Sequence, residues 1–415
     1  MNKNLDAIFL YPLTWVDDEA RMFADTAREW ANKEIISDRL NYQKNYQKLF
    51  IEKRRILSVD IGFQRLVLPE DNGGFGWNTP SSAPGIMNVF SEIGRADAAT
   101  GYVTALKYAI FATIAMEHNM NKKLCDILAP QYLADEIKTL SLILPGAGRA
   151  GEETPLFMGR AIRARIEEKE DAFILDGEAL RPMGCGAEAD LFCIVCADSD
   201  NRPCIAFVPA ETKGVIKGDP IQQTGLDACK NADITLKKVK IPKENCIKRD
   251  GAIMELYAWL NLLLGGVSIG AAMNFHEILD EWAQSRVIKG AEPMKENPLC
   301  AFVLAEVADD IATARLINFS LSHIMAQPDE WGKVGDKGIY TFAQMIGARV
   351  QRLSLNALNR GMELMGSAGY AKEWHVEKHW RDIKTIQSHL AGLASNAPVM
   401  MDVSNFFYNS PEVQK

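Results

Sequence analysis

The sequence contains no long basic stretch. Among its 415 residues, 54 aspartates and glutamates outnumber 46 lysines and arginines, and the formal net charge is -8. The longest basic cluster, residues 53–55 (KRR), is short, and we interpret it as a solvated face of a helix. Proteins that bind nucleic acid neutralise phosphates with many clustered lysines and arginines. We therefore expect no nucleic-acid partner for this chain.

A secretion signal is not evident either. The apolar stretch at residues 8–13 is too short for a signal core and is interrupted by Pro12, so we expect a cytoplasmic protein. Residues 256–275 carry no charge and are about long enough to span a bilayer. They include several glycines and asparagines, and charged segments follow them without a basic flank. We interpret this stretch as a buried helix of a bundle, and we expect no membrane span.

The cysteines do not form a metal-binding pattern. The chain has 8 of them, which we expect to be reduced thiols in the absence of a secretion signal. Cys193 and Cys196 are spaced as C-x-x-C, but they lie in an apolar run typical of a strand, where residues three apart point to opposite faces. No second C-x-x-C pair accompanies them. We therefore expect buried structural cysteines and no metal site.

The spacing of apolar residues changes twice along the chain. Up to about residue 138 it is helical, from about 139 to 250 short apolar runs alternate with polar turns, and after Gly251 the helical spacing returns. This order predicts an α+β chain with an N-terminal helical domain (1–138), a central antiparallel β domain (139–250) and a C-terminal four-helix bundle (251–415). The expected helices are 16–34, 43–59, 86–93, 100–116, 253–286, 297–325, 336–366 and 382–408, and the expected strands are 140–144, 161–166, 172–175, 191–195, 204–208 and 234–241.

A glycine-rich loop follows the first expected strand. Residues 146–151 read G-A-G-R-A-G, which matches the G-x-G-x-x-G pattern of dinucleotide-binding folds. In such folds a helix opens directly after the glycines, so that its N-terminus faces the pyrophosphate. Here residues 152–159 read as a loop and then an antiparallel strand. We therefore reject a dinucleotide fold and interpret the glycines as a loop whose backbone can approach a flat ring or a phosphate.

Five segments stand in order along the chain: 68–76 (LPEDNGGFG), 92–97 (EIGRAD), 145–148 (PGAG), 366–370 (GSAGY) and 373–384 (EWHVEKHWRDIK). Taken together, they resemble the acyl-CoA dehydrogenase family from about residue 15 to 400. The resemblance implies a three-part fold, FAD bound between the parts, and assembly into a homodimer or homotetramer. It also implies α,β-dehydrogenation of an acyl-CoA substrate, in which a base removes the α-proton, a hydride goes to the flavin, and the electrons leave to an electron-transfer flavoprotein.

The resemblance also implies which residues contact FAD. Arg286, after the long helix, matches the arginine that reaches the FAD pyrophosphate of a neighbouring subunit, where a cation suits a diphosphate. The alternative is a solvated arginine at a helix end. The full set of expected cofactor-binding residues is Leu144, Pro145, Gly146, Gly148, Met183, Arg286, Glu363, Gly366 and Gly369.

The sequence departs from the family pattern at the expected active site. The position of the family's catalytic glutamate is Leu390, and the alternative position of the base on the first bundle helix is Leu260. Neither side chain can accept a proton. Other family positions are also changed. Asn261 replaces an arginine that helps to hold CoA, and Met183 replaces a threonine near flavin N5. Arg149 replaces a serine, and Glu363 replaces a glutamine near the pyrophosphate, where the glutamate adds an unfavourable negative charge.

Two residues are candidates for a replacement base. Asp97 could face the acyl pocket, although an aspartate there also suits a helix cap. His389 neighbours the vacated glutamate position and titrates near neutrality, but adjacent helical residues differ by about 100° in direction. His375 and His379 are spaced i, i+4 but lack the H-E-x-x-H pattern of a metal pair. For all three histidines, the competing interpretation is an ordinary surface residue.

Three hypotheses for function follow. The first is an active acyl-CoA oxidoreductase with an atypical base, or with a substrate that needs none because it loses a leaving group. The second is a base-deficient subunit of a heteromeric acyl-CoA dehydrogenase, which lends Arg286 and structure to a partner's site. The third, flavin monooxygenation, is disfavoured because the Arg-Asp-x-Lys segment follows the dehydrogenase pattern. Loss of the base, the CoA arginine and the N5 threonine together favours the second hypothesis.

Overall fold

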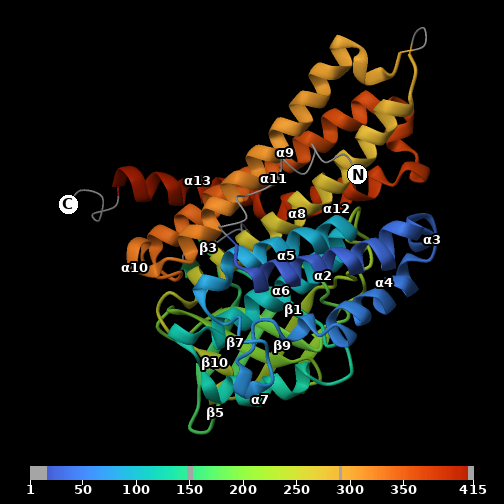
Figure 1. The fold of residues 1–415 in the computed structure, drawn as a ribbon. Helices are drawn as coiled ribbons and strands as arrows, with labels where there is room; N and C mark the ends of the chain where they lie inside the picture. The colour runs from blue at the N-terminus through green and yellow to red at the C-terminus, as the bar shows by residue number, and fades with distance from the viewer. Residues whose placement is uncertain (1–15, 147–152, 289–291, 410–415) are drawn as a thin grey trace.

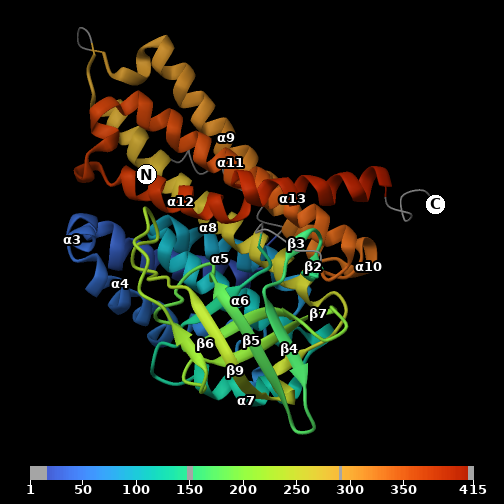
Figure 2. The ribbon, with the colours of Figure 1, turned by 180° about the vertical axis from the view of Figure 1, so that it is seen from behind.

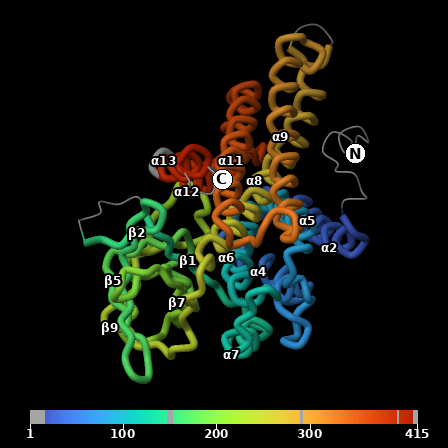
Figure 3. Tube along the Cα trace, turned by 90° about the vertical axis from the view of Figure 1, so that its left-hand side faces the viewer, coloured from blue at the N-terminus to red at the C-terminus, as the bar shows by residue number. Residues whose placement is uncertain are grey.

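The computed structural model describes residues 16–146, 153–288 and 292–409 and has three parts (Figure 1). Helices come first, a sheet follows, and long helices complete the chain, as the α+β prediction requires. The long helices extend away from the other two parts, which lie side by side beneath them (Figure 3). The predicted three-part architecture is therefore confirmed.

The N-terminal part consists of helices that surround the strongly buried α6 (Ala98–Ala115). A single residue, Asp97, separates α6 from α5 (Ala83–Ala96), and its side chain caps α6 by accepting a hydrogen bond from the Thr100 amide at 2.9 Å. The other helices are α2 (Asp18–Trp30), α3 (Arg39–Lys44), α4 (Tyr46–Arg55) and α7 (Lys122–Tyr132).

The basic cluster at 53–55 does not form a solvated helix face. Arg54 is buried in the structure, and its guanidinium donates a hydrogen bond to Thr139 Oγ1 at 2.7 Å. Lys53 pairs with Glu34 at 2.9 Å, and only Arg55 is well exposed, where it pairs with Asp60. The interpretation from sequence was wrong for Arg54 because its partner lies 85 residues away in the chain.

The central part is one curved sheet, seen from behind in Figure 2, with strand order β10-β7-β6-β4-β5-β9-β8, and β1 pairs with β6. Most pairs are antiparallel, but β6 runs parallel to both β1 and β4, so the sheet is not purely antiparallel. A separate hairpin, β2 (Leu156–Phe157) with β3 (Arg160–Ala161), lies near the bundle. The sheet strands are β1 (Leu140–Ile143), β4 (Ala164–Glu168), β5 (Ala172–Leu180), β6 (Leu191–Ala197), β7 (Pro203–Pro209), β8 (Val215–Lys217), β9 (Ile234–Pro242) and β10 (Cys246–Ile247).

The two cysteines of the C-x-x-C pair point to opposite faces of β6. Cys193 packs into the core that the sheet shares with the helices, and Cys196 packs into the core on the other face of the sheet. Cys196 instead lies beside its cross-strand partner Cys204, with 3.5 Å between the sulfurs. In the described ranges, no group of three or more His, Cys, Asp or Glu residues is placed to hold a metal ion.

The C-terminal bundle is built on α8 (Ala252–Ser285), α9 (Pro298–Met325) and α11 (Lys337–Met365), whose bounds lie within one residue of those predicted. The fourth predicted helix, 382–408, was wrong as a single element. The structure has α12 (Val376–Leu390) and α13 (Leu393–Ser404), separated by a break at Ala391 and Gly392. A Cβ on Gly392 would come within 2.6 Å of the Ser388 carbonyl oxygen, so glycine is needed for this sharp turn.

The uncharged stretch 256–275 lies within α8, in the interior of the protein. By length and composition, both α6 and α8 could cross a membrane, but 89% and 94% of their apolar windows are buried inside the structure. Glycines allow α8 to approach α5 closely: a Cβ on Gly270 would lie 1.8 Å from the Ser91 carbonyl oxygen. The stretch is therefore a core helix, as predicted.

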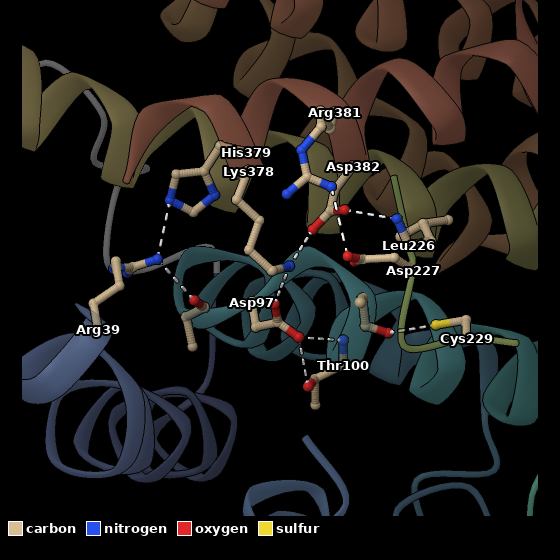
Figure 4. A network of polar contacts seen from close by, with 12 residues as sticks. Arg39, Asp97, Thr100, Leu226, Asp227, Cys229, Lys378, His379, Arg381 and Asp382 are labelled. Carbon is tan, nitrogen blue, oxygen red and sulfur yellow. Dashed lines mark hydrogen bonds and ion pairs between the residues drawn. The ribbon is translucent and has the colours of Figure 1, made fainter. Parts of the chain in front are cut away.

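A buried ion-pair network joins the three parts (Figure 4). The Lys378 amine of α12 pairs with Asp97 at 2.7 Å and also with Asp382, and all three side chains are almost fully buried. Asp382 accepts a hydrogen bond at 2.7 Å from the amide of Leu226, which precedes β9. Burial opposes ionisation of Asp97, but the charge of Lys378 and hydrogen bonds from Thr100 hold its pKa below the ordinary value.

We expect the K378M variant to lose about 3–5 kcal/mol in its free energy of unfolding, because two buried carboxylates would lose the cation that pairs with them. Chemical denaturation measures this loss. The matched control is K384M, on the exposed face of the same helix, which we expect to change the free energy by less than about 0.5 kcal/mol. Equal losses in the two variants would contradict the structural role of Lys378.

Candidate functional site

A cavity of about 360 Å³ lies between the sheet and the bundle. Its floor comes from the loop after β1 and the segment after β5, and its walls come from α8, α11 and the junction of α12 with α13. The volume is in the range of ligand-binding pockets. The lining residues are Leu144, Pro145, Gly146, Arg160, Arg181, Pro182, Met183, Ile221, Gln223, Asn231, Tyr257, Gln344, Ser388, His389, Leu390, Ser395, Pro398 and Val399.

The structure brings part of the predicted site together in this cavity. Leu144, Pro145, Gly146 and Met183, all expected to contact FAD, line it, although they come from two segments about 40 residues apart. Gly148 and Arg149 lie outside the described residues. Leu390, at one expected base position, and the neighbouring candidate His389 also line the cavity.

The other expected cofactor residues do not line the cavity. Arg286 follows α8 and is exposed, while Glu363 is exposed near the end of α11 and pairs with Arg360 at 2.8 Å. Gly366 has a φ of 60° and Gly369 is buried in the turn that follows α11. The proposed contact of Arg286 with a neighbouring subunit stays a prediction.

No carboxylate is among the described residues that line the cavity. Leu390 presents hydrocarbon there, and Leu260 is fully buried in α8 without lining the cavity. Asn261, next to it, donates hydrogen bonds to the Tyr257 carbonyl oxygen at 2.8 Å and to Gln344 Oε1 at 2.7 Å. The side-chain amide of Asn261 therefore forms its hydrogen bonds within the bundle.

Asp97 is placed away from the cavity lining. One carboxylate oxygen accepts hydrogen bonds from the Thr100 amide and hydroxyl at 2.9 and 2.8 Å, and the other pairs with Lys378 (Figure 4). All of these partners are buried or nearly so. The carboxylate thus serves as a helix cap and as an ion-pair partner in this structure.

His389 is held in the cavity wall by Tyr102 of α6. The Tyr102 hydroxyl lies 2.9 Å from His389 Nδ1 and donates a hydrogen bond to the Met183 carbonyl oxygen at 3.0 Å. A phenol has one proton to donate. Since that proton is directed to Met183, the hydroxyl accepts from His389 Nδ1–H. This arrangement makes Nε2 the unprotonated nitrogen of the neutral ring.

Burial lowers the pKa of His389 to about 4. The ring is therefore neutral at physiological pH, and its basicity is close to that of an ordinary glutamate, whose pKa is about 4.3. The surface interpretation does not hold for this residue, which is half-buried in the cavity wall. It was also wrong for His379, which is buried beside Arg39 and Asn274 and whose pKa burial likewise lowers.

Sequence reasoning missed the polar residues of the cavity. Arg160, in β3, is 5% exposed and pairs with Asp402 of α13 at 2.9 Å. Arg181 forms a two-point ion pair with Asp233, at 2.7 and 2.8 Å. The partners of both arginines lie more than 50 residues away, and no motif in the sequence marks them.

The cavity residues fit a flat, amphipathic ring. A Cβ added to Gly146 would meet nothing within 4 Å, so the backbone there faces open space. Leu144, Gly146 and Arg181 also line a second cavity, of about 420 Å³, that adjoins the first. Two adjacent cavities that share an apolar residue and exposed backbone suit a ligand with a ring at one end and an extended arm.

Comparisons with known proteins agree with this architecture. The family model for the acyl-CoA dehydrogenase N-terminal domain matches residues 17–124, and that for the acyl-CoA dehydrogenase C-terminal domain matches residues 262–392. The chain is similar to cyclohex-1-ene-1-carbonyl-CoA dehydrogenase of Geobacter metallireducens, with 22% identity over 379 residues, which cover 89% of this chain and 93% of that protein. It is also similar to 3-(aryl)acrylate reductase of Clostridium sporogenes, with 23% identity over 384 residues, which cover 89% and 94%.

Among solved structures, glutaryl-CoA dehydrogenase from Mycobacterium smegmatis matches with a TM-score of 0.76 at 16% identity. The match covers 97% of each chain. At this level of identity the likeness concerns the fold alone.

We expect His389 to carry its proton on Nδ1 and to remain neutral as the pH is lowered from 8 to about 5, because its folded-state pKa is about 4. Nitrogen-15 NMR of protein labelled at histidine measures both properties. The chain has 6 histidines, and the H389Q variant identifies the signal. Protonation of this ring near pH 6.5, or a proton on Nε2, would contradict the assignment.

Proposed function

Because the chain belongs to the acyl-CoA dehydrogenase family, we propose that it is an FAD-dependent oxidoreductase that acts on the CH–CH group of an acyl-CoA thioester. The observation that supports this most is the cavity between sheet and bundle. It gathers the residues that the family uses beside the flavin ring, Leu144 to Gly146, with the end of α12, where the family places its base. We expect electron-transfer flavoprotein as the electron acceptor.

In this proposal Leu144, Pro145, Gly146 and Met183 hold the flavin ring of FAD, which supplies the hydride acceptor when bound. The backbone amide of Met183 is already used, since it donates to the Leu142 carbonyl oxygen at 2.8 Å. Contacts to the ring from this residue therefore come from its side chain. The pyrophosphate contacts of Arg286, Gly366 and Gly369 require a neighbouring copy of the chain in a homodimer or homotetramer.

His389 then takes the role of the base. Its Nε2 accepts the α-proton of the acyl group, while Nδ1–H continues to donate to Tyr102, which fixes the orientation of the ring. Leu390, Pro398 and Val399 line the same cavity and exclude water from the reacting end of the substrate. A substrate that loses a leaving group would not need the base.

The second candidate is a non-catalytic subunit of a heteromeric acyl-CoA dehydrogenase. The cavity favours it in one respect, since hydrocarbon stands where the carboxylate is expected and no lining carboxylate compensates among the described residues. The two candidates differ in the properties of the isolated chain. A catalytic chain reacts by itself, whereas a subunit of the second kind needs its partner.

The visible spectrum of the purified chain tests the proposal. A yellow protein whose flavin band bleaches under anaerobic titration with short, branched or cyclic acyl-CoA thioesters supports the oxidoreductase. A colourless protein that does not bind added FAD contradicts it and favours the non-catalytic subunit. Retention of FAD without bleaching by any acyl-CoA also contradicts the proposed reaction.

For the H389Q variant we expect the rate of flavin reduction to fall by about 10²–10⁴-fold, because glutamine keeps the approximate shape but cannot accept a proton. Stopped-flow absorbance at saturating acyl-CoA measures the rate. The control H323Q, on the exposed face of α9, should reduce its flavin at the normal rate. A normal rate in H389Q would remove this residue from the mechanism.

The L390E variant distinguishes the two candidates. If His389 already serves as base, a second base at position 390 should change the rate of flavin reduction by less than about 10-fold. If the chain lacks a base, glutamate at this cavity-lining position should create a rate that the original chain does not have, with a gain on the order of 10²-fold or more. The same stopped-flow assay decides between these outcomes.

A further inference from the structure

The cavity contains one buried cation with an unused donor. Arg160 is 5% exposed, and its Nη1 pairs with Asp402 Oδ2 at 2.9 Å and donates to the Met158 carbonyl oxygen at 2.9 Å. Its Nη2 is buried and has no hydrogen-bond partner. Buried N–H groups without an acceptor are rare in folded proteins, so each one calls for an explanation. At a residue that lines a cavity, a ligand oxygen is such an explanation.

The guanidinium is held in a fixed position by groups from three elements. Asp402 also accepts a hydrogen bond from the Tyr340 hydroxyl at 2.9 Å, and Gln344 Nε2 lies within hydrogen-bond distance of that hydroxyl, at 3.2 Å. Gln344 in turn accepts from Asn261. Arg160 further lies over the ring of Tyr257, with its Cζ 5.9 Å from the ring centre. The donor therefore belongs to a preorganised network rather than to a free surface side chain.

The charge of this network determines which acceptor fits. Asp402 is itself 6% exposed, and it neutralises Arg160 at close range. A charged carboxylate placed on Nη2 would be buried near Asp402 and would be repelled by it. An uncharged oxygen would take the hydrogen bond without that repulsion.

We propose that Arg160 Nη2 donates a hydrogen bond to an uncharged carbonyl oxygen of the molecule bound in this cavity. This inference rests on the proposed function, which supplies two such molecules. One source is a ring carbonyl of the flavin, and the other is an amide or thioester carbonyl of the acyl-CoA. Arg160 is thus a positioning residue for the ligand, and it is independent of the base.

The R160K variant tests the inference with little loss of structure, because lysine keeps the ion pair with Asp402 but does not offer the second, forked N–H group. Two affinities are measured: that of FAD for the flavin-stripped protein, by fluorescence quenching, and that of butyryl-CoA for the FAD-saturated protein, by calorimetry. The matched control is R165K, at an exposed arginine of β4. The double variant R160M/D402N removes the pair together and serves if R160K is poorly folded.

We expect one of the two dissociation constants to rise on the order of 10-fold in R160K and in R160M/D402N, as for the loss of one hydrogen bond, and neither to change in R165K. A change in FAD binding identifies the flavin carbonyl as the acceptor, and a change in butyryl-CoA binding alone identifies the thioester ligand. Unchanged constants for both ligands would overturn the role of Arg160 while leaving the proposed function intact. Failure of the original chain to bind either ligand would overturn both.

Discussion

The amine of Lys378 lies between two buried carboxylates that belong to different parts of the chain. Asp97 begins the core helix of the N-terminal part, and Asp382 lies one turn further along α12 and binds the backbone before β9. Charges so deeply buried are tolerated only when they are paired and fully hydrogen-bonded. The three parts must therefore dock in one arrangement for this network to form, and the orientation of α12 follows from it.

The orientation of α12 matters because the same helix ends in the cavity. His389 and Leu390 lie about three turns beyond the lysine, where the break at Gly392 opens the wall that α13 completes. Tyr102 of α6 then fixes the imidazole from the opposite side. His389 is the only histidine among the described residues that line the cavity. Its position is thus determined by a contact with α6, the same core helix that Asp97 caps. Rigid support of this kind is what a catalytic group requires.

The electrostatic character of the cavity is unusual for a site expected to remove a proton. Its lining carries arginines, each already paired with an aspartate outside the lining, and a neutral histidine, but no carboxylate among the described residues. Proton transfer to such a site would create an imidazolium on a half-buried ring, and burial, which lowers the pKa of His389, opposes that charge. A reaction through His389 therefore benefits from a bound ligand that develops negative charge.

Much of this arrangement could be predicted from the sequence. The rest depends on contacts between residues far apart in the chain, which no local sequence pattern indicates. The periodicity of α8, α9 and α11 predicts their ends within one residue, because each is a long amphipathic or buried helix with polar or glycine boundaries. The break between α12 and α13 was missed because a single glycine is tolerated inside a helix. Only the structure shows that the Ser388 carbonyl oxygen lies too close to Gly392 for any larger residue. His389 contacts Tyr102, which lies 287 positions away in the chain, and Arg160 pairs with Asp402, which lies 242 positions away. The periodicity of apolar residues cannot predict such contacts.

We propose that an acyl-thioester flavoprotein fold has kept its cavity while an imidazole has replaced the carboxylate that removes the proton. The most direct test is a crystal structure of the protein with FAD and an unreactive acyl-CoA analogue. We expect His389 Nε2 to lie within about 3.5 Å of the α-carbon, and no carboxylate oxygen to lie as close. A glutamate or aspartate placed over the flavin ring, from this chain or from a neighbouring subunit, would contradict it.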